Sequence, residues 1–250
     1  MRLLALALLL PIVATAQPVR PWTATVQHSA EVFDGARATW LEAELSVERR
    51  LAGGAVIASA GRAERYDQAA GFGGVDVYTV LAPKLYGNVR ARLAPGAETV
   101  ARRDLLAELY LGLPGGLEVS AGARRLDFAE AGATLLLSSA TLFRPAGRLR
   151  ARLSATPTDS ATAVAASLTA RLDLDRGAAR RRSYVELRGG RGQEVIAEPG
   201  DPVGVRTSWN LGAGGRLRVG RRLALGADVG RVWDGDLSRL TARAALSVEL

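Results

Sequence analysis

Apolar and polar residues alternate along most of the chain. In segment 238–250, one phase is occupied by Leu240, Ala242, Ala244, Leu246, Val248 and Leu250, and the other phase is mostly polar. Because successive side chains of a strand point to opposite faces, this pattern predicts a β-strand with one apolar face. The pattern recurs in segments 40–51, 87–95 and 147–156. The chain is therefore predicted to be all-β.

The predicted strands are long, and two kinds of connection separate them. Runs of about 9 to 13 residues match the length that a tilted strand needs to cross a bilayer. Short connections are predicted at 52–54, 86–88, 113–116, 144–147, 176–182 and 220–222, and longer ones at 67–74, 95–103 and 194–204. Outer-membrane barrels show this asymmetry, with tight periplasmic turns and longer outside loops. If Leu250 ends on the periplasmic side, the short turns lie on that side.

The number of strands follows from the requirement for an even count. Thirteen strands are recognisable from residue 39 onward, whereas single-chain bacterial barrels usually have an even number. Segment 22–33 also alternates and supplies a fourteenth strand, at the cost of placing His28 in the apolar phase. We therefore predict a transmembrane antiparallel β-barrel of 14 strands. The alternatives are 12 strands, if 75–85 and 87–95 merge or drop out, and a soluble β-sandwich, which alternates in the same way.

The first residues have the features of an export signal. Arg2 precedes an apolar run that is too short to span a bilayer, and Ala14-Thr15-Ala16 resembles a cleavage site. We expect residues 1–16 to be a cleaved signal peptide and 17–250 to form a single barrel domain in the bacterial outer membrane. No later stretch has 18 consecutive apolar residues, so no transmembrane helix is predicted.

With the apolar phase facing lipid, the polar phase fills the lumen. The predicted lumen-lining residues are Glu42, Glu44, Glu48, Asp76, Tyr78, Arg90, Arg92, Glu108, Tyr110, Glu118, Arg124, Arg148, Arg150 and Arg152. Arg62 and Glu64 are also expected inside. Trp209 and Trp233 lie in the apolar phase near strand ends, as expected for aromatic residues at a membrane interface.

These lumen charges have two interpretations. Buried charge is tolerated when it is paired or solvated. The residues could form a salt-bridged lattice in a plugged, structural barrel, or they could line a narrow pore or carrier for small polar or anionic solutes.

Composition limits the chemistry of any active site. The chain has no cysteine and one histidine, which excludes thiol catalysis, cysteine-based metal sites and any chemistry that needs two histidines. His28 lies in the apolar phase, away from the predicted lumen acids. We therefore predict no enzymatic activity, no cofactor and no metal. The net charge of +8 combines 33 basic with 25 acidic residues, and Arg180 to Arg182 lack the aromatic platforms of a nucleic-acid site, so no nucleic-acid partner is expected.

Part of the chain resembles a known family. The resemblance to the YaiO family of outer-membrane β-barrel proteins is carried by Arg65-Tyr66-Asp67, Asp76-Val77-Tyr78, Pro83-Lys84-Leu85-Tyr86, Glu108-Leu109-Tyr110, the run from Leu113 to Arg124, and Phe128. It is best between residues 40 and 128. It implies a barrel in the outer membrane and no particular substrate.

The expected partners follow from this location. They are outer-membrane lipids and lipopolysaccharide, and the barrel-assembly machinery acting through the C-terminal strand. The chain ends in Leu250 rather than in the phenylalanine typical of such barrels.

Overall fold

The fold was determined as a computed structural model that describes residues 22–34, 39–157, 162–175, 183–196, 204–235 and 237–250. The predicted signal peptide lies outside these residues. Fourteen strands make up most of the described chain: β1 (Trp22–Phe33), β2 (Trp40–Leu51), β3 (Gly54–Arg65), β4 (Gln68–Ala82), β5 (Leu85–Leu93), β6 (Arg103–Gly112), β7 (Leu117–Asp127), β8 (Gly132–Arg144), β9 (Gly147–Pro157), β10 (Thr162–Asp173), β11 (Tyr184–Ile196), β12 (Gly204–Val219), β13 (Leu223–Asp234) and β14 (Leu237–Glu249). A single 3₁₀ turn, η1 (Pro114–Gly116), precedes β7.

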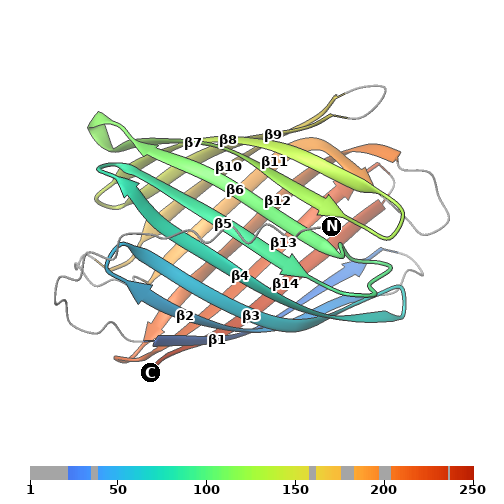
Figure 1. The fold of residues 1–250 in the computed structure, drawn as a ribbon, viewed down its shortest axis with the longest axis horizontal. Coiled ribbons are helices and arrows are strands. Elements are labelled where there is room, and N and C mark those ends of the chain that lie inside the picture. Colours follow the sequence, from blue (N-terminus) through green and yellow to red (C-terminus); the bar gives the residue numbers. More distant parts are fainter. Residues whose placement is uncertain (1–21, 35–38, 158–161, 176–182, 197–203, 236) are drawn as a thin grey trace, which may run out of the picture.

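The strands form one closed antiparallel barrel. Each strand pairs with its neighbours in sequence, and β1 pairs with β14 from Thr23 opposite Glu249 to Phe33 opposite Arg239. Figure 1 shows the strands running obliquely around the barrel. Closure satisfies the backbone hydrogen bonds of both end strands and removes the open edges, which lipid would not tolerate. The prediction of 14 strands is confirmed, including the strand at 22–33, and the 12-strand and sandwich alternatives are wrong.

The outer wall of the barrel is apolar. Leucine and valine side chains that face outward are about half exposed on every part of the wall, for example Val26, Leu45, Leu109, Leu168 and Val229. Such a continuous apolar surface would be a liability in water, whereas it is the expected surface of a barrel in lipid. No helix among the described residues is long and apolar enough to cross a membrane.

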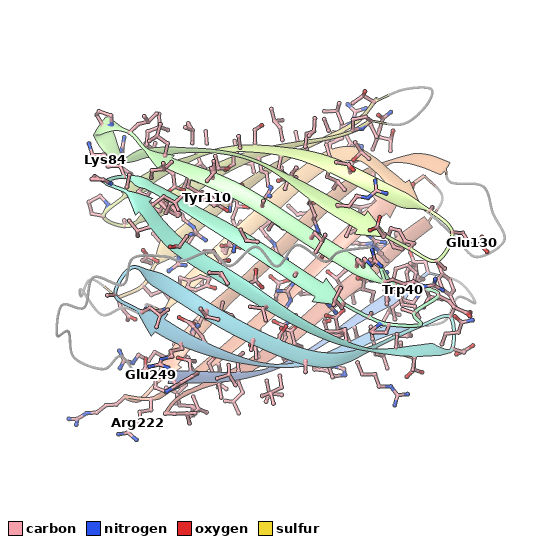
Figure 2. The ribbon with its side chains drawn as sticks, in the orientation of Figure 1. Trp40, Lys84, Tyr110, Glu130, Arg222 and Glu249 are labelled. Carbon is pink, nitrogen blue, oxygen red and sulfur yellow. The ribbon has the colours of Figure 1, made fainter. Side chains whose placement is uncertain are left out.

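The barrel has two ends, which we name by the chain termini. The terminal end carries the start of β1 and the end of β14, and the distal end is opposite. Figure 2 shows Lys84, Arg222 and Glu249 at the terminal end, and Trp40 and Glu130 at the distal end. If the terminal end faces the periplasm, as the sequence predicts, the distal end faces outward.

Two predicted connections are wrong. The glycine-rich segment 67–74 is not a loop, because β3 and β4 are joined by a two-residue turn in which Tyr66 and Asp67 both have positive φ. The turn predicted at 86–88 lies instead at Pro83 and Lys84, and residues 86–88 belong to β5. In both places, glycines that favour turns locally are paired in the ladder instead, Gly71 and Gly73 with β3 and Gly87 with β4.

Arg62 and Glu64 were also predicted wrongly. They lie opposite Ala43 and Leu41 of β2, which face outward, so both charged side chains are on the outer wall near the distal end. The Arg62 Nη2 and Glu64 Oε2 atoms are 3.5 Å apart. The side chains of β3 alternate regularly between the two faces of the wall. This alternation places Arg62 and Glu64 outside although both are charged.

The connection between β5 and β6 packs against the inner wall at the distal mouth. Ala94 and Ala97 are buried together with Ala63 of β3 and Phe72 of β4, and Val100 packs against this cluster. The Phe72 ring lies over Gly61, where an added Cβ would come within 2.4 Å of the ring. The segment 94–101 therefore covers part of the distal opening, and we call it the mouth loop.

Candidate functional site

Apart from Arg62 and Glu64, the side chains predicted to line the lumen face inward. Glu42, Glu44, Glu48, Asp76, Tyr78, Arg90, Arg92, Glu108, Tyr110, Glu118, Arg124, Arg148, Arg150 and Arg152 all occupy the inward phase of their strands. They do not form a single group. Some pack into a polar cluster on the side of β5 to β9, and others, on β2, β4 and β5, line a cavity that is bordered by β1 to β5 and β14.

The packed side is organised around Glu108. Its side chain is only 1% exposed and accepts a hydrogen bond of 2.7 Å from Ser120 and one of 3.2 Å from Arg152. The Arg150 guanidinium is 3.6 Å from the same carboxylate. We call Glu108, Ser120, Arg150 and Arg152 the Glu108 cluster. Two guanidinium groups around one buried carboxylate tie β6 to β9 across the lumen.

Two tyrosines extend this packed region toward the terminal end. The rings of Tyr86 and Tyr110 are parallel, with centroids 4.8 Å apart. The Tyr86 hydroxyl donates a hydrogen bond to Glu118 of β7. The stack and the Glu108 cluster together fill one side of the barrel.

Further ion pairs brace the rest of the lumen. Those with nitrogen–oxygen distances of 3.0 Å or less join Arg90 to Asp76 (2.8 Å), Arg92 to Glu42 (3.0 Å), Arg124 to Asp104 (2.7 Å), Arg171 to Asp173 (2.8 Å), Arg188 to Asp228 (2.5 Å) and Arg50 to Glu48 (2.5 Å). Arg148 is 3.9 Å from Glu186. Glu44 has no ion pair with any described side chain, and it lines a lumen cavity of about 530 Å³.

Three cavities follow one another through the barrel. The cavity at the distal mouth measures about 170 Å³ and includes Glu42 and Arg92 in its lining. The same two residues line the central cavity of about 530 Å³. Gln27 and Arg243 line both the central cavity and a third one of about 270 Å³ near the terminal end. The shared residues show that these cavities are neighbours along the lumen.

Two arrangements of side chains lie where neighbouring cavities share lining residues. At the distal junction, the Arg92 guanidinium carbon lies 3.4 Å from the centre of the Phe72 ring while Arg92 pairs with Glu42. Phe72 in turn supports the mouth loop. The inner junction is formed by Gln27 and Arg243, and Arg243 has no ion pair with any described side chain.

Several lumen arginines retain unused hydrogen-bond donors. Arg148 Nε, Arg150 Nε and Arg216 Nη2 are buried and have no hydrogen-bond acceptor among the described atoms. Arg216 lines the terminal cavity. A surplus of guanidinium donors makes the lumen suited to anions or to groups rich in acceptor oxygens.

Sequence reasoning missed some of these residues. Asp104, Gln27 and Arg216 line the cavities but were not among the predicted site residues. Asp104 adjoins a predicted loop, and Gln27 belongs to the strand with the weakest pattern. Strict alternation from Leu105 and Val26 would have placed both side chains inside.

Other predicted residues lie on the outer wall. Trp209 and Trp233 are opposite each other on β12 and β13, and their side chains are 55% and 39% exposed. His28 also faces outward, away from the lumen acids. No group of three metal-ligating side chains occurs among the described residues.

Solved structures with the same fold come from the bacterial outer membrane. A bacterial polysaccharide outer membrane secretin aligns with a TM-score of 0.59 at 8% identity, over 94% of this chain and all of that chain. Omp33 of Acinetobacter baumannii aligns with a TM-score of 0.55 at 12% identity, over 93% of this chain and all of that one. OccK3 of Pseudomonas aeruginosa aligns at 0.51 and 11%, over 92% and 95% of the two chains. At these identities the likeness shows the fold alone.

Comparison with family models identifies the chain more specifically. No match was found among curated proteins. The model described as the YaiO membrane beta barrel domain matches residues 23–195. This match extends beyond residues 40–128, which carry the recognisable sequence motifs. Together with the closed barrel and its apolar wall, this match shows that the chain is a β-barrel of the outer membrane and belongs to the YaiO family.

Proposed function

We propose that this barrel is a narrow, non-enzymatic pore or carrier for small polar solutes, with a preference for anions. The observation that supports the proposal is the series of three neighbouring lumen cavities, which share Glu42 with Arg92 and Gln27 with Arg243 in their linings. Their volumes of about 170 to 530 Å³ limit the solute to a small one.

The preference for anions is supported by the arginines of the terminal cavity. Arg216 has a buried donor without an acceptor, and neither Arg216 nor Arg243 has an ion pair with a described side chain. An anion that enters this cavity would gain charge-assisted hydrogen bonds that the resting barrel does not make.

The second candidate is a structural surface barrel with a plugged lumen. The Glu108 cluster, the tyrosine stack and the mouth loop favour it, because they narrow the lumen and brace the wall. The two candidates differ in one measurable property, the passage of ions.

The test is conductance and ion selectivity in planar lipid bilayers. The wild-type barrel in a KCl gradient is expected to give discrete steps and a reversal potential that indicates chloride preference. The double variant R216Q/R243Q removes two positive charges from the lumen and should shift the reversal potential toward that of potassium. A suitable control is R49Q, because Arg49 lies on the outer wall over Trp22. A barrel that inserts but stays electrically silent would refute the pore and favour the structural candidate.

Two partner proposals accompany the location in the outer membrane. We propose that lipids and lipopolysaccharide contact the apolar wall, and that the barrel-assembly machinery engages β14 during insertion. The closing position of β14 supports the second proposal, because β1 finds its partner only when β14 is in place.

A further inference from the structure

The outer wall carries an apolar groove where β9 to β13 lie side by side. The groove has a volume of about 560 Å³. Its floor is low because Gly189 has no side chain and Ala151 and Ala166 carry only methyl groups. Leu153 and Leu168 rise beside this floor, and both are about half exposed. The groove is therefore a shallow apolar depression on the lipid-facing wall, with room for one flexible chain.

One end of the groove is marked by aromatic and cationic groups. Trp209 lies opposite Arg191 on one side and Trp233 on the other. The Arg191 guanidinium carbon is 4.9 Å from the Trp209 ring centre, and that of Arg231 is 5.8 Å from the Trp233 ring centre. Arg231 also pairs with Asp34 at 3.1 Å, whereas Arg191 has no ion pair with any described side chain. Arg191 is therefore the cation available to a ligand in the groove.

The tryptophan end of the groove lies at the height expected for the edge of the apolar band of the membrane. Each tryptophan is ten residues from the terminal end of its strand, at Val219 or Leu223. With a rise of about 3.4 Å per residue and a tilt of about 40°, this corresponds to roughly 25 Å, the height of the apolar band of such barrels. Both rings thus lie at the distal interface, where lipid headgroups begin.

Other outward-facing arginines gather at the same height. Arg62, Arg103, Arg125 and Arg231 all lie within three residues of the distal ends of their strands. Arg125 and Arg231 are about half exposed although each has an acidic partner. Arg62, Arg125 and Arg231 each pair with an outward carboxylate, so they mark the height of the interface, whereas Arg191 keeps its charge available to an anionic headgroup.

We propose that the groove and Arg191 form a binding site for a phosphorylated glycolipid of the outer leaflet, lipopolysaccharide. One acyl chain lies along Gly189 between Leu153, Leu168 and Trp209. A phosphate group of the headgroup accepts hydrogen bonds from Arg191, whose guanidinium is held in place by the Trp209 ring. The site lies on the outer wall and is independent of whether the lumen conducts.

The experiment measures lipid A bound to the purified full-length barrel in detergent by native mass spectrometry. Two variants address the two halves of the site. R191Q removes the charge, and G189L fills the groove. A Cβ added at Gly189 meets only ordinary contacts, at 3.7 Å or more, so G189L is compatible with the fold. Matched controls are R125Q, an outward arginine elsewhere at the distal end, and A107L, an outward alanine on β6.

The expected result is saturable binding of lipid A to the wild type. R191Q and G189L should each weaken it by at least about tenfold, which corresponds to ~1.4 kcal/mol, whereas R125Q and A107L should bind like the wild type. Lipid A without phosphates should bind the wild type as weakly as intact lipid A binds R191Q. Inorganic phosphate alone should not compete at concentrations near that of the lipid. Equal binding by all four variants, or equal binding of lipid A with and without phosphates, would overturn the proposal.

Discussion

At the scale of single residues, the lumen depends most on one carboxylate. Glu108 is almost fully enclosed and faces both Arg150 and Arg152. Glu44, by contrast, has no described ion partner and faces the central cavity. Both glutamates face the lumen, and they differ in that Glu108 is held between two arginines whereas Glu44 only lines a cavity.

We expect E108Q to lower the free energy of unfolding by about 3 kcal/mol, because it leaves two arginines beside a neutral group in a buried site. E44Q should lower it by less than about 1 kcal/mol. Urea unfolding followed by the heat-modifiable shift on a gel measures both values. Equal losses for the two variants would show that the Glu108 cluster does not brace the barrel.

The partner of each charge is not contained in the local sequence. Alternation predicts that Glu108 and Arg152 both face inward, but they are joined across β6 and β9, three strands apart. The same holds for Arg92 of β5 and Glu42 of β2. Such pairs depend on the curvature and stagger of the closed wall, which no single strand specifies.

At the scale of elements, the mouth loop decides how open the distal end is. Its position is maintained by Phe72 and by backbone hydrogen bonds such as Ala94 N–H to the Arg102 carbonyl at 2.9 Å. The Arg102 guanidinium also donates to the Ala97 carbonyl at 2.7 Å. Because the cluster under the loop consists mainly of alanine, Phe72 provides most of its buried apolar area.

F72A is therefore expected to release the mouth loop and increase the single-channel conductance. Removal of a buried phenylalanine ring costs about 3 kcal/mol of packing, and here it also removes the ring beneath Arg92. L109A is the control, since Leu109 faces outward from β6 and is exposed. If F72A conducts like the wild type and L109A, the mouth loop does not limit passage.

At the scale of the whole molecule, the apolar outer wall indicates that lipid surrounds the barrel. β13 illustrates this, because Val229 and Leu225 both face outward and are about half exposed, but at different heights. Val229 is near the middle of its strand, and Leu225 is close to the terminal end. In lipid, a charged side chain costs more free energy at the height of Val229 than at the height of Leu225, whereas in water the two costs would be similar.

V229R should accordingly lower the free energy of unfolding in lipid vesicles by about 2 to 4 kcal/mol, and L225R by about 1 kcal/mol or less. The measurement is reversible unfolding in denaturant, monitored by tryptophan fluorescence. Similar small effects at both positions would contradict a lipid-facing wall at this height.

The sequence by itself determined the class of fold, the number of strands and the face on which each side chain lies, because a strand has a period of two and lipid requires one apolar face. It misplaced the turns around segments 67–74 and 86–88, because glycine and asparagine favour turns locally while a closed ladder keeps them paired. Only the tertiary structure decided which charges form ion pairs and which residues neighbouring cavities share. It also decided that Gly189 leaves a groove beside Arg191. These features bring together strands that are distant in sequence, and their geometry is set by closure of the barrel.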